Sequence, residues 1–164
     1  MRKHISAIIA VLVVLILTLC GCGNQVKSSP EVLQKYYEEM MENYFEYISS
    51  TTYGISTSVA REIAETETAA LEKFEKMSVP EEYDFHHRVL LAAAEKEREW
   101  IKVLRDYADG VIDYEGIYEK QMEMRPDGRS EFTTRCLNII AELNHNPGVK
   151  PTEKGQMLEM LSKL

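Results

Sequence analysis

Two neighbouring histidines, His86 and His87, are the side chains whose type and spacing best suit chemistry in this sequence. Glu82 precedes His86 by one helical turn, so in a helix the carboxylate and the imidazole would share a face. Imidazoles and carboxylates both bind divalent metals, and helical bundles hold such ions in their cores. These three residues are therefore the weak candidates for a metal or small-ligand site.

The pattern around the histidines lacks the known signatures of metal sites. Di-iron bundles supply Glu-x-x-His from two helices, but residue 83 is Tyr, and Asp84 stands three before His87 with the wrong acid. Neither His-Glu-x-x-His nor a Cys/His zinc set occurs. We therefore expect no metal cofactor, and the favoured interpretation is a partly buried histidine at the edge of a core.

The amino terminus has the layout of an export signal. Arg2 and Lys3 precede an apolar run from Ile5 to Leu19, and about fifteen residues is the usual length of a signal core. A helix that crosses a bilayer needs roughly twenty. The run leads directly into Leu19-Cys20-Gly21-Cys22. These four residues resemble the lipobox of bacterial lipoproteins, which joins a large aliphatic residue and two small ones to the lipidated cysteine.

The resemblance implies cleavage between Gly21 and Cys22 and a diacylglyceryl group on the Cys22 sulfur. Cys20 fits poorly as the lipidated residue because bulky Leu19 would stand before it. With Cys22 as the lipidated residue, Cys20 occupies the middle position of the lipobox, where Ala, Ser or Thr is more usual. The implied location is the extracytoplasmic face of the cell membrane, and no cofactor is expected besides the covalent lipid on Cys22. An uncleaved amino-terminal anchor is the alternative.

The net negative charge of the chain argues against partners that are themselves anionic. The chain has 27 acidic and 19 basic residues, a net charge of −8, and it becomes more negative once the signal carrying Arg2 and Lys3 is lost. An acidic domain is repelled by phosphates and by anionic lipid headgroups. We therefore expect no nucleic-acid binding and no electrostatic adhesion to membranes.

After processing, Cys136 is the one thiol left beside the lipidated Cys22, so no disulfide can form within the chain. Cys136 lies in an apolar helical stripe with Phe132, Ile140 and Leu143, and a buried free cysteine behaves as a small hydrophobe. We expect a buried, unreactive thiol.

Apolar residues recur at helical spacing along the rest of the chain. Ser29 is the expected N-cap of the first helix, and Ser78 with Glu81 predicts a capping box before the third. His86 and Glu97 fall on the third helix's apolar line, where we expect Glu97 to snorkel or to pair with a basic residue. No strand is predicted. The predicted helices cover about 30–50, 56–77, 81–109, 113–124 and 129–144, with a short last helix from Thr152 to 164.

We therefore predict an all-α fold, an antiparallel bundle of four to five helices behind a signal peptide. The predicted limits are 1–21 for the signal, 22–29 for the lipidated cysteine and a short flexible tether, and 30–164 for the bundle. Whether 111–144 forms one kinked helix or two stays open.

Tyrosines and methionines are concentrated in the first and fourth helices. Tyr114, Ile117, Tyr118 and Met122 are predicted to face inward on the fourth. The favoured interpretation places these side chains in or at the edge of the core, and the alternative is an adaptable groove between the two helices.

The function that we expect is a non-catalytic binding or interaction module at the cell envelope, with a protein partner and a membrane attachment through the lipid. The alternative is a metal- or ligand-handling domain that uses His86, His87 and nearby acids. The sequence leaves the partner, the oligomeric state and the type of envelope open.

Overall fold

The computed structural model of the protein describes residues 24–49, 56–126 and 128–163. This part of the chain is mostly helical, which confirms the all-α class. The predicted signal, its Gly21–Cys22 cleavage site and the lipidation site at Cys22 lie outside the described residues. No helix within the described ranges is both long enough and apolar enough to span a membrane.

Six α-helices account for most of the described residues. Their positions agree with the predicted ranges to within a few residues, and residues 111–144 form two separate helices rather than one kinked helix. The helices are α2 (Pro30–Ser49), α3 (Thr57–Lys76), α4 (Asp84–Ala108), α5 (Tyr114–Met124), α6 (Glu131–Asn144) and α7 (Glu153–Ser162).

Most helix starts are capped by a side chain, as the sequence predicts for the first and last. The Ser29 hydroxyl accepts a hydrogen bond from the Val32 amide at 3.3 Å, and Thr152 accepts one from the Gly155 amide at 3.1 Å. Because the first amides of a helix have no partner within it, each such bond stabilises the helix end.

The predicted capping box before α4 is wrong. Ser78–Pro80 is extended and forms β2, and a 3₁₀ turn over Glu81–Tyr83 leads into α4 without a side-chain cap. Proline disfavours helical backbone at the residue before it, which keeps Val79 extended.

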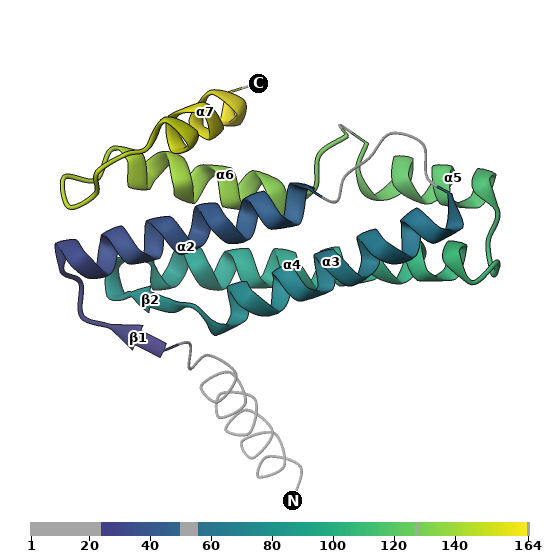
Figure 1. The fold of residues 1–164 in the computed structure, drawn as a ribbon, viewed down its shortest axis with the longest axis horizontal. Coiled ribbons are helices and arrows are strands. Elements are labelled where there is room, and N and C mark those ends of the chain that lie inside the picture. Colours follow the sequence, from purple (N-terminus) through teal and green to yellow (C-terminus); the bar gives the residue numbers. More distant parts are fainter. Residues whose placement is uncertain (1–23, 50–55, 127, 164) are drawn as a thin grey trace, which may run out of the picture.

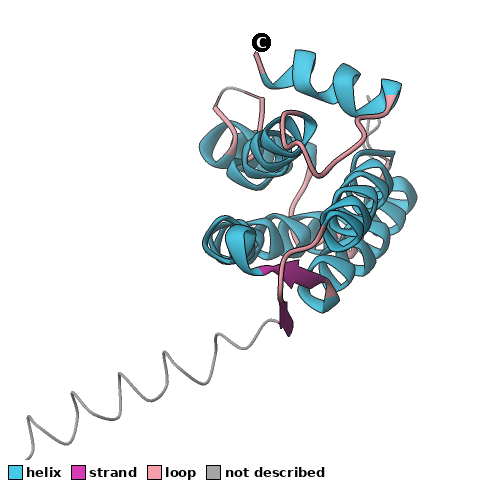
Figure 2. Cartoon of the chain, turned by 90° about the vertical axis from the view of Figure 1, so that its left-hand side faces the viewer, coloured by secondary structure: helices cyan, strands magenta, loops and turns pink. Residues whose placement is uncertain are grey.

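The prediction that the chain has no strand is also wrong. β1 (Asn24–Val26) pairs with β2 in parallel, with Gln25 opposite Val79 (Figure 2). Each strand has three residues, too few to show an alternating pattern in the sequence. The pairing also corrects the expected free tether over 22–29, since part of it is bound to the body of the fold.

Four helices enclose the core. α2 packs against α3 and α6, and α4 packs against the same two helices. α7 covers α6, and α5 contacts α4 at the end of the molecule away from the two strands (Figure 1). The largest fully buried side chains come from all four core helices and from α7, and include Tyr36, Tyr37, Met40, Leu71, Phe74, Leu90, Leu104, Phe132, Ile140, Leu143 and Leu158.

The tyrosines and methionines of α2 are core residues. Tyr36, Tyr37, Met40, Tyr44 and Tyr47 are each at most 3% exposed. Rings from three helices meet here, because Phe132 packs edge-on against both Tyr47 and Phe74. The core interpretation of these residues is confirmed, and the adaptable groove between the first and fourth helices is wrong.

Candidate functional site

His87 is a core residue whose two ring nitrogens are both occupied. Its Nε2 donates to the Phe74 carbonyl oxygen at 3.0 Å, so its Nδ1 is the acceptor for the Tyr36 hydroxyl, also at 3.0 Å. Burial disfavours the charged imidazolium and lowers the pKa of His87. This neutral imidazole links α4 to α2 and to the end of α3.

His86 and Glu82 do not join His87 in a site. His86 is on the solvent side of α4, where its Nδ1 lies 3.1 Å from a carboxylate oxygen of Glu142, so its predicted place on the inward line is wrong. Glu82 accepts a hydrogen bond from the Asn146 side chain at 3.0 Å. The buried side of α4 and the turn before it includes Tyr83, His87 and Leu90. The buried histidine is therefore His87, one residue after the predicted His86.

Over the ranges that the structure describes, no three His, Cys, Asp or Glu side chains are grouped as metal ligands. Cys136 is fully buried, and burial raises the pKa of its thiol. The expectation of a buried Cys136 is confirmed.

A cluster of charged side chains lies inside the bundle. Glu97 accepts a hydrogen bond from the Tyr47 hydroxyl at 2.7 Å and forms an ion pair with Arg125. The Arg125 guanidinium lies over the Trp100 ring, 4.7 Å from its centroid. Glu97 is thus paired with a basic residue, as predicted, but it is only 3% exposed and does not snorkel.

Glu67 is the member of this cluster that the sequence analysis missed. It is 3% exposed, and its Oε2 has no hydrogen-bond partner among the described residues. Burial raises the pKa of Glu67 to about 7, although Arg125 lowers it. The apolar periodicity of the sequence could have revealed that Glu67 is buried, because position 67 lies at helical spacing between Ile63 and Ala70.

The charged cluster has little room for a ligand. The cavity beside it measures about 120 Å³ and is lined by Glu97, Trp100, Arg125 and Ser130, among others. Such a volume suits a few water molecules rather than an organic substrate. Because Tyr47, Glu67 and Glu97 come from three helices and Arg125 from the segment after α5, the cluster ties four parts of the chain together.

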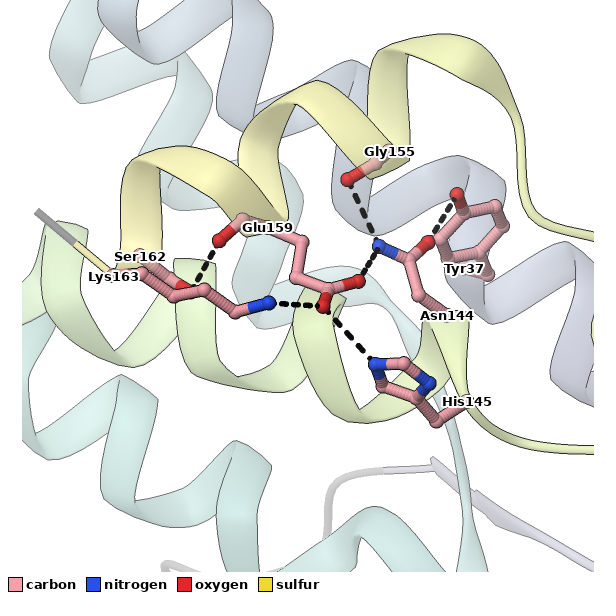
Figure 3. A network of polar contacts seen from close by, with 7 residues as sticks. All are labelled: Tyr37, Asn144, His145, Gly155, Glu159, Ser162 and Lys163. Atoms are coloured by element: carbon pink, nitrogen blue, oxygen red, sulfur yellow. Dashed lines mark hydrogen bonds and ion pairs between the residues drawn. The ribbon is translucent and has the colours of Figure 1, made fainter.

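A second polar network holds α7 on the fold (Figure 3). The Asn144 amide donates to the Gly155 carbonyl oxygen at 2.9 Å, and its oxygen accepts from the Tyr37 hydroxyl at 2.7 Å. Glu159 interacts with His145 at 3.0 Å and with Lys163 at 2.8 Å. Hydrogen bonds from Lys163 and then His145 lower the pKa of Glu159 to about 2. The network positions a helix and leaves no open coordination or nucleophilic site.

The exposed side of α5 carries three large apolar side chains, as many as α7 exposes at Met157, Met160 and Leu161. Tyr114, Tyr118 and Met122 are 64%, 56% and 49% exposed, and we call them the apolar row. Their predicted inward orientation is wrong, because α5 packs on α4 through Ile117, the one buried residue of this helix. The apolar residues of α5 fall on two sides, and packing on α4 uses only one.

A line of carboxylates runs beside the apolar row. Glu115, Glu119 and Glu123 are all exposed, and we call them the acidic row. Both rows repeat every four residues, so each forms a continuous strip along the helix. Lys120 pairs with Glu123 at 2.6 Å, while Glu115 and Glu119 have no ion pair within the described residues.

The turn before α5 extends this surface. Val111 is 70% exposed, and a shallow groove of about 680 Å³ separates the end of α4 from the start of α5. Its lining combines Tyr107, Val111, Ile112 and Tyr114 with the polar Asp113 and Thr57. We call this groove and the two rows of α5 together the α5 surface.

Comparisons with protein-family models, with curated proteins and with solved structures find no match to this chain. The α5 surface is therefore assessed on its own chemistry. Tyrosine and methionine are enriched in protein interfaces, and large exposed apolar patches on a folded domain mark sites of interaction.

Proposed function

We propose that the protein is a lipid-anchored binding module at the extracytoplasmic face of the cell membrane, without catalytic activity. In this proposal residues 1–21 are a cleaved signal and Cys22 carries the lipid. The described helices form an antiparallel bundle that presents the α5 surface to an envelope protein. Leu19-Cys20-Gly21-Cys22 supports the anchor.

The observation that carries the binding function is the exposure of the apolar row. These side chains belong to a helix that contacts the body through Ile117, about 100° around the helix from Tyr118, so the surface is presented without unfolding any part of the core. Burying apolar area contributes roughly 25 cal/mol per Å² before the costs of association are subtracted. Two tyrosines and a methionine supply the kind of area that dominates binding energy.

The histidines do not favour the alternative of a metal- or ligand-handling domain. Both nitrogens of His87 already have partners inside the core, and His86 and Glu82 have different partners of their own. No observation on these residues supports a second candidate function.

The anchor is tested by replacing Cys22→Ser and following a metabolic fatty-acid label in fractionated cells. We expect the variant to lose the label and the membrane association, because a hydroxyl cannot form the thioether. Cys20→Ser is the matched control and should keep both, since serine is usual at that position of a lipobox. A labelled Cys22→Ser protein would contradict the anchor.

The binding surface is tested by photocrosslinking in cells. Benzoylphenylalanine introduced at Tyr118 should capture a discrete envelope protein, whereas the same residue introduced at exposed Glu65 on α3 should not. Equal capture from both positions, or none from position 118, would argue against the α5 surface as the binding site.

A further inference from the structure

We infer that the partner of the α5 surface is a basic amphipathic helix that places its apolar side on the apolar row and its cationic side on the acidic row. This inference rests on the proposed function and specifies the partner's chemistry. It is carried by the side-by-side arrangement of the two rows.

The two rows match the faces of a partner helix. The first and last residues of each row are eight positions apart, which is about 12 Å of helix length at 1.5 Å per residue. Adjacent residues are about 100° apart around a helix, so the rows form neighbouring strips rather than opposite sides. An amphipathic helix lying along α5 would cover both strips at once, as one helix does when it packs side by side on another.

Charge selects a cationic partner. Carboxylates four residues apart on a helix repel one another. Lys120 forms its ion pair with Glu123 and interacts more weakly with Glu119, so one lysine partly offsets the charge of three carboxylates. A partner with Lys or Arg beside its apolar side would relieve this repulsion while it covers the apolar row. Complementary charge of this kind also speeds association and fixes orientation.

The same charges disfavour two other occupants of the surface. A second copy of this chain brings the net charge of −8 and its own acidic row, so self-association would juxtapose like charges. An anionic membrane would be repelled in the same way. An extended peptide is disfavoured because it binds by adding to a sheet edge, and α5 offers no such edge.

The inference is tested with the full mature chain and a synthetic Leu/Lys peptide of about 18 residues in amphipathic helical spacing, a length at which an isolated helix can form. Binding is measured by fluorescence anisotropy at about 0.05 M and about 0.5 M salt, since salt screens exposed charges. The variant is Glu115→Gln/Glu119→Gln/Glu123→Gln. The control Glu62→Gln/Glu65→Gln/Glu72→Gln removes the same charge from exposed positions on α3. Circular dichroism confirms that each variant is folded.

We expect the acidic-row variant to lower the affinity by about tenfold at low salt, and the α3 variant by less than about threefold. Tyr118→Ala/Met122→Ala should lower the affinity at both salt concentrations, because apolar contact is not screened. Equal losses from the two triple variants, or equal binding of a Leu/Glu peptide, would overturn the basic-helix inference. Capture at position 118 in cells together with no binding of the Leu/Lys peptide would leave the binding module standing and refute only the partner chemistry.

Discussion

Two buried ionisable side chains give the core opposite responses to pH. His87 is held neutral by burial and by hydrogen bonds to Tyr36 and Phe74, so protonating it costs stability. Glu67 is buried with one oxygen unpartnered among the described residues, so ionising it costs stability. Their effects oppose one another between pH 4.5 and 7, and single variants are needed to separate them.

His87 should make the protein less stable in acid. Its folded-state pKa lies below the ordinary 6.5, so its contribution is complete above pH 6.5 and is lost as the pH falls through the lowered value. In His87→Gln, which keeps a neutral donor, the free energy of unfolding should lose this pH dependence, worth up to about 1.4 kcal/mol per pH unit. Urea unfolding from pH 7 to pH 5 measures the slope. Exposed His86→Gln is the control, and an unchanged slope in the His87 variant would refute this role.

Glu67 should make the protein less stable in base. Its folded-state pKa of about 7 lies above the ordinary 4.5, so its protonated form stabilises the fold fully below pH 4.5, and this stability is lost as the pH rises through 7. Glu67→Gln mimics the protonated form and should raise the free energy of unfolding at pH 8 by at most about 3 kcal/mol. The gain should vanish near pH 4. Glu65→Gln, which alters an exposed acid of the same helix, should show neither effect.

At the scale of single residues, the sequence predicted the chemistry of a position better than its orientation. It offered a basic partner as one of two expectations for Glu97, because a buried charge without a partner is costly, and the structure has that partner. It placed His86 on the inward line where the structure has His87, since both continue the three-four spacing from Tyr83 to Leu90. It could not find Arg125 as the partner, because that contact depends on how the segment between α5 and α6 folds back.

Among the elements, α7 depends on one glycine for its position. A Cβ atom at Gly155 would lie within 2.8 Å of the Tyr37 ring and within 2.9 Å of the Asn144 side-chain oxygen. The network in Figure 3 therefore requires a residue without a side chain where α7 meets α2 and α6.

Gly155→Ala should destabilise the protein by about 1–3 kcal/mol, the usual cost of overpacking, despite the better helix propensity of alanine. Urea unfolding gives the total cost, and hydrogen exchange should show that α7 loses protection first. Gly116→Ala on α5 is the matched control. A Cβ there meets its nearest neighbours at 3.4 Å, so this change should be neutral or mildly stabilising. A Gly155→Ala protein as stable as the control would contradict the packing account.

Helices were predictable as elements because their apolar periodicity and N-caps are local signals. The strand pair was not, because β1 and β2 have three residues each and are stabilised by partners more than fifty residues apart in sequence. The orientation of α5 was not predictable either. Its apolar residues point in two directions, and only the position of α4 decides that Ile117 is buried while Tyr118 stays exposed.

The described part of the molecule has two structurally distinct ends. The strand pair lies at one end of the long axis, and the α5 surface lies at the other (Figure 1). α4 follows β2 after one 3₁₀ turn and leads into α5, so a single helix of 25 residues separates them. The binding proposal places the anchor at one end and the contact surface at the other.

In the proposed lipid-anchored protein, the pairing of β1 with β2 would limit the distance between the bilayer and the bound partner. Asn24 follows Cys22 by two residues. At a maximal extension of about 3.6 Å per residue, this connection is at most about 7 Å long. α4 adds about 37 Å of rise. With lipid on Cys22, the contact surface would therefore lie within a distance on the order of 50 Å of the membrane. The anchored protein would then meet its partners by diffusion in the plane of the membrane. It could bind only those that hold their basic helix within this distance of the bilayer.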